Sequence, residues 1–173
     1  MNQPLSAALL AALAAPAFAA PAQQTELPRF PAPQNLNFAQ VQGKNQSFEL
    51  NGQTIRYRAF ENIVYVLKPT DSRYQTMNVY IPEAYFSGGS IDGYTAHTAP
   101  IFFPNNIGGY MPATAGQPEN DQRAGGKPNA IMIALSKGYV VASAGARGRT
   151  EANGHAPAAI VDLKAAVRYL KAN

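Results

Sequence analysis

A serine stands near the end of an apolar run in residues 140–149, "VVASAGARGR", with a glycine two residues after it. The nucleophile of many ester hydrolases sits in the pattern G-x-S-x-G, because only small neighbours fit the sharp strand-to-helix turn. Two residues before Ser143 stands Val141, and the residues after it form a polar loop without helical periodicity. Ser143 meets neither requirement, so we predict that it is a strand-end residue with a satisfied hydroxyl.

The two histidines are the remaining candidates for proton transfer. His97 stands in "YTAHTAP", before an apolar run, and His155 stands in the loop "NGHAP". We expect both to be surface loop residues. The chain has no cysteine, which excludes disulfides, a thiol nucleophile and thiolate metal sites. It also has no H-E-x-x-H motif and no calcium-loop pattern, so we predict neither a metal nor a cofactor.

Composition limits the class of protein. The 173 residues are enough for one domain, and 46% of them are apolar, which is enough for a packed core. The formal net charge is +4, but the basic residues are scattered and form no run. A nucleic-acid-binding surface needs clustered charge, so we predict no nucleic-acid partner.

Residues 1–19 have the pattern of an export signal. The apolar run Leu5–Phe18 is shorter than the roughly 20 residues that span a bilayer. It leads into Ala17-Phe18-Ala19, a small-x-small cleavage site, although no Lys or Arg precedes it. A disordered Ala-rich tail is the alternative. An export signal on a chain without cysteine predicts a periplasmic or secreted bacterial protein, and no other run is long and apolar enough for a membrane span.

Residues 20–46 are predicted to form a Pro-rich linker or surface strap, because prolines fix φ and remove backbone donors. The domain proper is predicted over residues 47–173. Asn51-Gly52 separates two β-rich runs, which is a strong hairpin signal. Two further runs, 63–69 and 74–82, each end in proline, and together these runs predict an antiparallel meander.

The second half alternates strand, loop, helix, strand, loop and helix, which predicts parallel strands joined by right-handed crossovers. The first strand, residues 99–104, is uninterruptedly apolar and should be covered on both faces. A helix is predicted between Asn129 as N-cap and Gly138 as C-cap. In the last helix, one apolar face is predicted to be buried, made of Ile160, Leu163, Val167 and Leu170. The fold class is therefore α/β, with antiparallel strands leading into a βαβα part.

Three segments in this order carry a resemblance to a known family: "APIFFPNNIGGYMP", "ALSKGYVVASAGARGR" and "APAAIVDLKAAVRYLKAN". From about Tyr57 to Asn173 the chain resembles the N-terminal half of the α/β-hydrolase fold. It is most similar to secreted serine esterases of the bacterial tannase and feruloyl esterase group. The resemblance implies a sheet truncated before the nucleophile strand. It also implies a small-molecule carboxylic ester as substrate.

The sequence departs from this family in its catalytic residues. It contains no G-x-S-x-G, and both histidines precede the place where the nucleophile should come, whereas the fold's order is serine, acid, histidine. We therefore predict that these residues alone are inactive. Two classes of function stay open: the N-terminal portion of a secreted ester hydrolase, and a non-catalytic truncated product or binding module derived from the same fold.

The resemblance assigns one half of an oxyanion site. Gly108, Gly109 and Tyr110 follow the strand of Ile101–Phe103, where the family points a backbone N–H at the developing oxyanion. Adjacent glycines permit backbone conformations that other residues avoid. An ordinary Gly-rich loop is the alternative.

Arg147 and Asp162 are predicted to form a structural ion pair. The residues three and four positions from Asp162 in its own helix are all alanine, so its partner must come from elsewhere. Arg147 in the preceding loop is the candidate, and anion binding by Arg147 and Arg149 is the alternative. We also predict an unpaired strand edge at residues 139–143, which makes self-association possible.

Overall fold

The structure, a computed structural model, describes residues 26–173. The export signal predicted for residues 1–19 lies outside the described residues. Residues 26–37 have no regular secondary structure and lead into a short 3₁₀ helix. The elements in order are η1 (Phe38–Gln40), β1 (Lys44–Leu50), β2 (Gln53–Val64), β3 (Thr76–Pro82), η2 (Glu83–Ser87), β4 (Ile101–Phe102), β5 (Asn120–Asp121), η3 (Gln122–Ala124), β6 (Lys127–Pro128), α1 (Ala130–Ser136), β7 (Val140–Ala144) and α2 (Ala158–Ala172).

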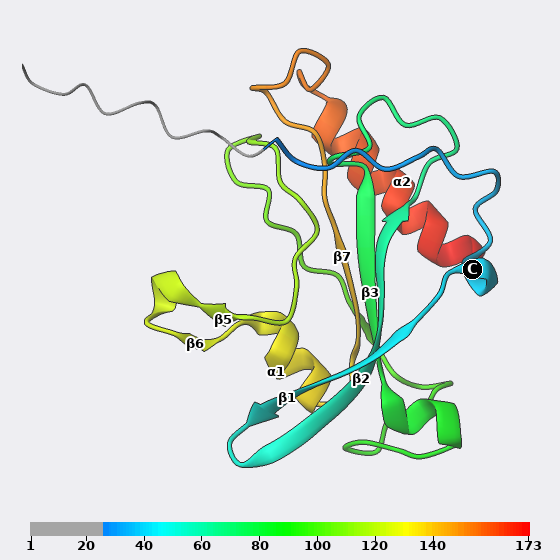
Figure 1. Cartoon of the computed structure of the whole chain (residues 1–173), viewed down its shortest axis with the longest axis vertical. Coiled ribbons are helices and arrows are strands. Elements are labelled where there is room, and N and C mark those ends of the chain that lie inside the picture. The colour runs from blue at the N-terminus through cyan, green and yellow to red at the C-terminus, as the bar shows by residue number, and fades with distance from the viewer. Residues whose placement is uncertain (1–25) are drawn as a thin grey trace, which may run out of the picture.

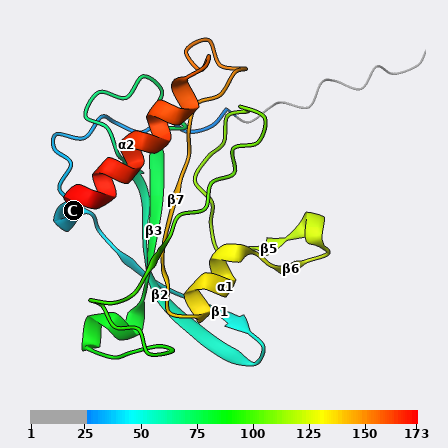
Figure 2. The same cartoon turned by 180° about the vertical axis from the view of Figure 1, so that it is seen from behind.

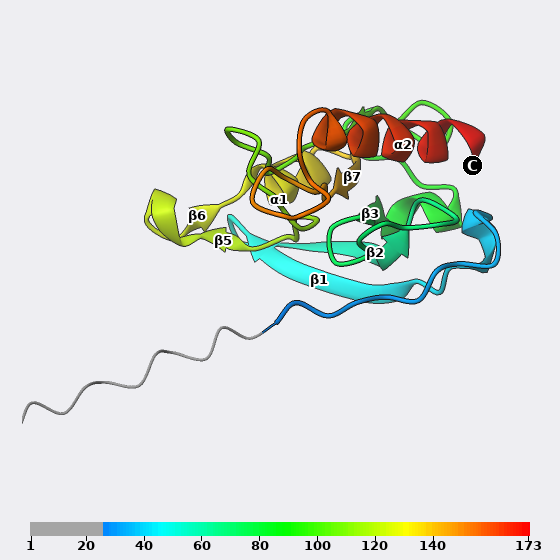
Figure 3. The same cartoon turned by 90° about the horizontal axis from the view of Figure 1, so that it is seen from above.

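A mixed five-stranded sheet organises the domain, with strand order β1-β2-β3-β7-β4 (Figure 1). Side chains alternate along each strand, so neighbours such as Val79 and Tyr80 point to opposite faces. Val79 belongs to the core cluster that includes Tyr169 of α2, and Tyr80 to the cluster that includes Ile131 of α1. The two helices therefore cover opposite faces of the sheet (Figures 2 and 3). This confirms an α/β fold with an antiparallel side.

The antiparallel side begins with the predicted hairpin. Asn51 and Gly52 have φ of 51° and 77° and join β1 to β2, with Leu50 opposite Gln53. The separate strand predicted for residues 63–69 is wrong. Ile63 and Val64 end β2, which continues through a register shift at Asn62, where φ is 59°. A β-bulge bends a strand without ending it, and so the meander has three strands.

The parallel side follows the predicted order of elements. Asn129 caps α1, because its side-chain oxygen accepts the Met132 N–H at 3.1 Å. Gly138 follows the C-cap of this helix with φ of 78°, in the left-handed conformation that commonly ends a helix and favours glycine. The strands β4 and β7 pair in parallel, with Ile101 opposite Val140 and α1 between them in the chain.

Two predictions about the environment of the strands on the parallel side are wrong. β4 is not covered on both faces, since Ile101 is 53% exposed. β7 is not an edge strand, because it lies between β3 and β4. Among residues 26–173, the open edge on the parallel side belongs to β4. The reason is the strand order: the chain returns after α1 to the inner side of β4, toward β3.

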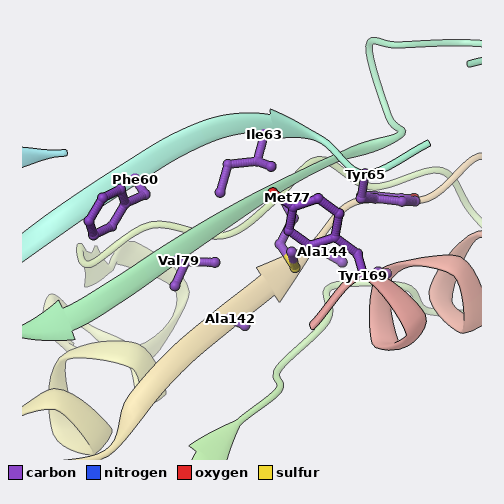
Figure 4. Close-up of a cluster of buried hydrophobic side chains, with 9 residues drawn as sticks. Phe60, Ile63, Tyr65, Met77, Val79, Ala142, Ala144 and Tyr169 are labelled. Carbon is purple, nitrogen blue, oxygen red and sulfur yellow. The ribbon is translucent and has the colours of Figure 1, made fainter. Parts of the chain in front are cut away.

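Helix α2 turns a different face inward from the one predicted. Ile160 and Val167 are 56% and 38% exposed, whereas the buried residues are Ala158, Ala159, Asp162, Ala166 and Tyr169. Small alanines let the helix approach the sheet closely, and Tyr169 reaches into the cluster around Met77 and Ala144 (Figure 4). Leu163 and Leu170 pack against that cluster while partly exposed. No helix within residues 26–173 is both long and apolar enough to cross a membrane.

Candidate functional site

The three residues predicted for the oxyanion site form one tight turn. The Met111 N–H donates to the Gly108 carbonyl at 3.0 Å, and Gly109 and Tyr110 between them have φ of 57° and 60°. Two central residues with positive φ make the turn of type I′. Gly109 takes this conformation freely. Tyr110 does not, because in the left-handed conformation its Cβ comes too close to the backbone. This conformation costs about 1–3 kcal/mol.

The first three amide N–H groups of this turn are free. Among the hydrogen bonds of residues 26–173, none has the N–H of Gly108, Gly109 or Tyr110 as its donor. All three residues are exposed, and the positions where a Cβ would stand on Gly108 and Gly109 have no atom within 4 Å. The turn is therefore open to solvent and can donate backbone hydrogen bonds to an oxygen that carries negative charge.

The loop that follows β7 is packed against this turn. Ala113 and Ala146 exchange two backbone hydrogen bonds of 3.1 and 2.9 Å, and the Arg149 N–H donates to the Tyr110 carbonyl at 2.7 Å. Gly148 lies so close to Met111 and Pro112 that a Cβ there would overlap their backbone atoms. A glycine is therefore required at position 148 by close packing.

Arg147 and Asp162, paired in the sequence analysis, lie together at the start of α2. The guanidinium binds the carboxylate in a bidentate way, with Nε–Oδ2 and Nη2–Oδ1 distances of 2.9 and 2.8 Å. The backbone N–H of Arg147 also donates to Oδ2 at 3.0 Å. The hydrogen bonds that Arg147 donates to the Asp162 carboxylate raise the pKa of Arg147 above its usual value. Asp162 is only 1% exposed, so its charge is fully withdrawn from water.

Further bonds extend this ion pair. Gln75 donates to Oδ1 of Asp162 at 2.8 Å, and Nη1 of Arg147 donates to the Asn153 carbonyl at 3.0 Å. Arg149 is exposed, and within the described residues its side chain forms no salt bridge. The two arginines therefore differ: Arg147 is engaged, and Arg149 is available to an anion.

The sequence analysis missed a second polar cluster. Arg73 donates from Nε to both oxygens of the buried Asp71, at 2.9 and 3.1 Å, and from Nη2 to Glu151 at 2.8 Å. The Tyr74 hydroxyl donates to Glu151 at 3.2 Å. The hydrogen bond from Arg73 lowers the pKa of Asp71. The local signal was an Asp two residues before Arg, whose backbone N–H it accepts in an Asx turn.

Ser143 is a buried residue of β7, in agreement with its predicted structural role. Its hydroxyl accepts the Gly116 N–H at 2.9 Å and donates to the Pro104 carbonyl at 3.1 Å. The side chain is 1% exposed, and His97 and His155 are exposed loop residues. No group of three His, Asp or Glu residues that could hold a metal occurs in residues 26–173.

Comparison with solved structures gives the relationship. The tannase of Fusobacterium nucleatum matches with a TM-score of 0.77 and 52% identity, over 80% of this chain and 30% of that one. The chain is tannase-like over these residues. The tannase of Lactobacillus plantarum gives a TM-score of 0.69 and 43% identity, over 76% and 29% of the two chains. A tannin acyl hydrolase in complex with ethyl gallate gives 0.68 and 43%, over 76% and 30%.

These matches confirm the resemblance to part of a bacterial tannase. The chain spans about 30% of the length of the solved tannases that it matches. No protein-family model matches the sequence, and no curated protein matches it either. The shared part supports an origin among carboxylic-ester hydrolases.

Proposed function

We propose that this chain supplies the oxyanion side of the active site of a tannase-like carboxylic-ester hydrolase. The observation that carries the proposal is the type I′ turn at Gly108–Met111, with three unengaged amide groups beyond the end of β4. The identity of 52% to a tannase supports the same reaction class. In ester hydrolysis the carbonyl oxygen gains negative charge when a nucleophile attacks, and such amides stabilise it.

The chain contains only part of the groups that ester hydrolysis requires. An oxyanion site of this fold takes one N–H from the loop after the strand and a second from the residue after the nucleophile. The 173 residues contain no G-x-S-x-G, and Ser143 is engaged by Gly116 and Pro104. The chain by itself is therefore inactive, and a serine, an acid and a histidine from further sequence would complete the site.

The proposed substrate is an ester of a hydroxylated aromatic acid. One solved relative is a tannin acyl hydrolase in complex with ethyl gallate, and another is in complex with 3,4-dihydroxybenzoate. Tyr110, which is 46% exposed beside the free amides, supplies an aromatic surface next to the reacting carbonyl. We further propose that residues 1–19 direct export to the periplasm or the medium.

Two measurements test this function. The 173-residue protein, incubated with ethyl gallate and a fluorophosphonate probe, should show neither turnover nor a labelled serine. The coding DNA beyond Asn173 should continue in frame to a G-x-S-x-G within about 20 codons, and the product of that longer frame should hydrolyse ethyl gallate. A stop codon, combined with binding of ethyl gallate without cleavage, would instead favour the non-catalytic binding module. A labelled serine in the 173-residue protein would overturn its inactivity.

A further inference from the structure

We propose that Asp162 and Arg147 are positioning residues for the Gly108–Met111 turn, acting through the loop of residues 145–149. The role in catalysis rests on the proposed function, but the mechanical coupling does not. In this view the buried carboxylate sets the path of one loop, and that loop holds the strained turn of another in the conformation that leaves its amides free.

The turn does not hold its own conformation. Its one internal hydrogen bond joins Met111 to Gly108, and its residues are exposed. Tyr110 has φ of 60°, which a residue with a bulky side chain adopts only when its surroundings impose it. Those surroundings must therefore contact the turn from another part of the chain.

The loop after β7 provides these contacts. Arg149 donates its N–H to the carbonyl of Tyr110, the strained residue itself. The two bonds between Ala113 and Ala146 fix the chain just beyond the turn, and Gly148 packs directly on Met111 and Pro112. Residues 146–149, which follow β7 on the way to α2 (Figure 1), thus hold the chain at Tyr110 and directly after it.

Asp162 in turn fixes this loop through its main chain. Its Oδ2 accepts the backbone N–H of Arg147 at 3.0 Å, in addition to the bidentate contact with the guanidinium. A carboxylate that only neutralised the arginine would leave the backbone free to move. Here the same oxygen constrains the peptide between Ala146 and Arg147, next to the Ala146–Ala113 bonds. The order of coupling is therefore Asp162, Arg147, the loop, and the turn.

A purely structural ion pair would stabilise the whole domain equally, whereas a positioning pair would stabilise the turn more than the rest of the domain. Local amide exchange distinguishes the two roles. In the full 173-residue chain, amide exchange should be followed by NMR at Met111, Ala113 and Arg149, whose N–H groups make the bonds described above. The amides of the β1–β2 hairpin serve as the internal reference. Asp162→Asn keeps the size of the side chain and removes its charge. It should accelerate exchange at the three amides at least about tenfold more than in the hairpin.

Two further variants separate the steps. Gly148→Ala leaves the ion pair intact but displaces Met111 and Pro112, so it should change the Tyr110 Cα and Cβ chemical shifts that report a positive φ. Lys137→Ala removes an ion pair with Asp92 at 3.8 Å. Because both side chains are exposed, this pair is far weaker than Arg147–Asp162, and the variant should change neither signal. The proposal is overturned if Asp162→Asn accelerates exchange equally in the turn and in the hairpin, or leaves both unchanged. No readout depends on ester hydrolysis, so failure here is distinct from failure of the proposed function.

Discussion

The hydroxyl of Ser143 accepts a hydrogen bond from the Gly116 N–H at 2.9 Å and donates one to the carbonyl of Pro104 at 3.1 Å. One buried side chain of the central sheet therefore joins two segments of the long loop that also contains the Gly108–Met111 turn. A serine engaged on both sides is a structural residue, and this has a measurable consequence.

Ser143→Ala should destabilise the chain by about 1–3 kcal/mol, because it leaves the Gly116 amide and the Pro104 carbonyl without their partner. The midpoint of urea unfolding measures the loss. Ser87→Ala is the matched control, since the Ser87 hydroxyl bonds the Ala84 carbonyl at 3.1 Å on the surface. The structural role is wrong if the two variants unfold alike.

Arg147→Ala should cost about 3–5 kcal/mol of unfolding free energy, because it leaves the buried carboxylate of Asp162 without its charged partner. Arg147→Lys should recover only part of this, since an ammonium cannot make the bidentate contact. Thermal or urea unfolding measures both effects. Wild-type stability of Arg147→Ala would show that the pair contributes nothing and would contradict its structural role.

Gly109→Ala and Gly108→Ala form a matched pair. Gly109 has φ of 57°, so an added Cβ strains the backbone, and we expect a loss of about 1 kcal/mol. Gly108 does not have a positive φ, and a Cβ there meets no atom within 4 Å, so its variant should unfold like the wild type. Equal unfolding midpoints for the two variants would contradict the type I′ geometry of the turn.

Acid should destabilise the chain through Asp71. The hydrogen bond from Arg73 lowers the pKa of this carboxyl in the folded state, whereas the unfolded chain protonates it near 3.9. The stabilisation is present above that value and is lost as pH falls through the lower, folded pKa. Asp71→Asn should weaken the dependence of the urea midpoint on pH between about 5 and 3. Asp92→Asn, at an exposed carboxylate, is the control and should retain it; an unchanged slope in Asp71→Asn would refute the assignment.

Local chemistry made part of the fold predictable. Asn51-Gly52 specifies a turn with two positive φ values, and Asn129 and Gly138 bound α1, so these features needed no knowledge of distant residues. The pairing of Asp162 followed by elimination, because its own helix offers only alanines at contact distance. A burial requirement that the local sequence cannot meet points to a long-range partner.

Long-range geometry explains the predictions that failed. Apolar periodicity selected Ile160 and Val167 as the buried face of α2, but close approach to the sheet favours small Ala159 and Ala166. The exposed position of β4 depends on strand order, which periodicity does not report. The local Asx turn indicates the contact between Asp71 and Arg73, but Glu151 lies 78 residues from Arg73, and no local pattern indicates that contact.

The open edge at β4 leads to the last prediction. Ile101 is 53% exposed on a strand whose outer backbone groups face no partner strand within residues 26–173, so we expect concentration-dependent self-association through this edge. Ile101→Lys places a charge on the edge and should shift sedimentation toward the monomer. Ile160→Lys adds the same charge at a residue 56% exposed on α2, away from any strand edge. If Ile160→Lys produces the monomer and Ile101→Lys does not, the association surface is the face of α2 and the edge hypothesis is wrong.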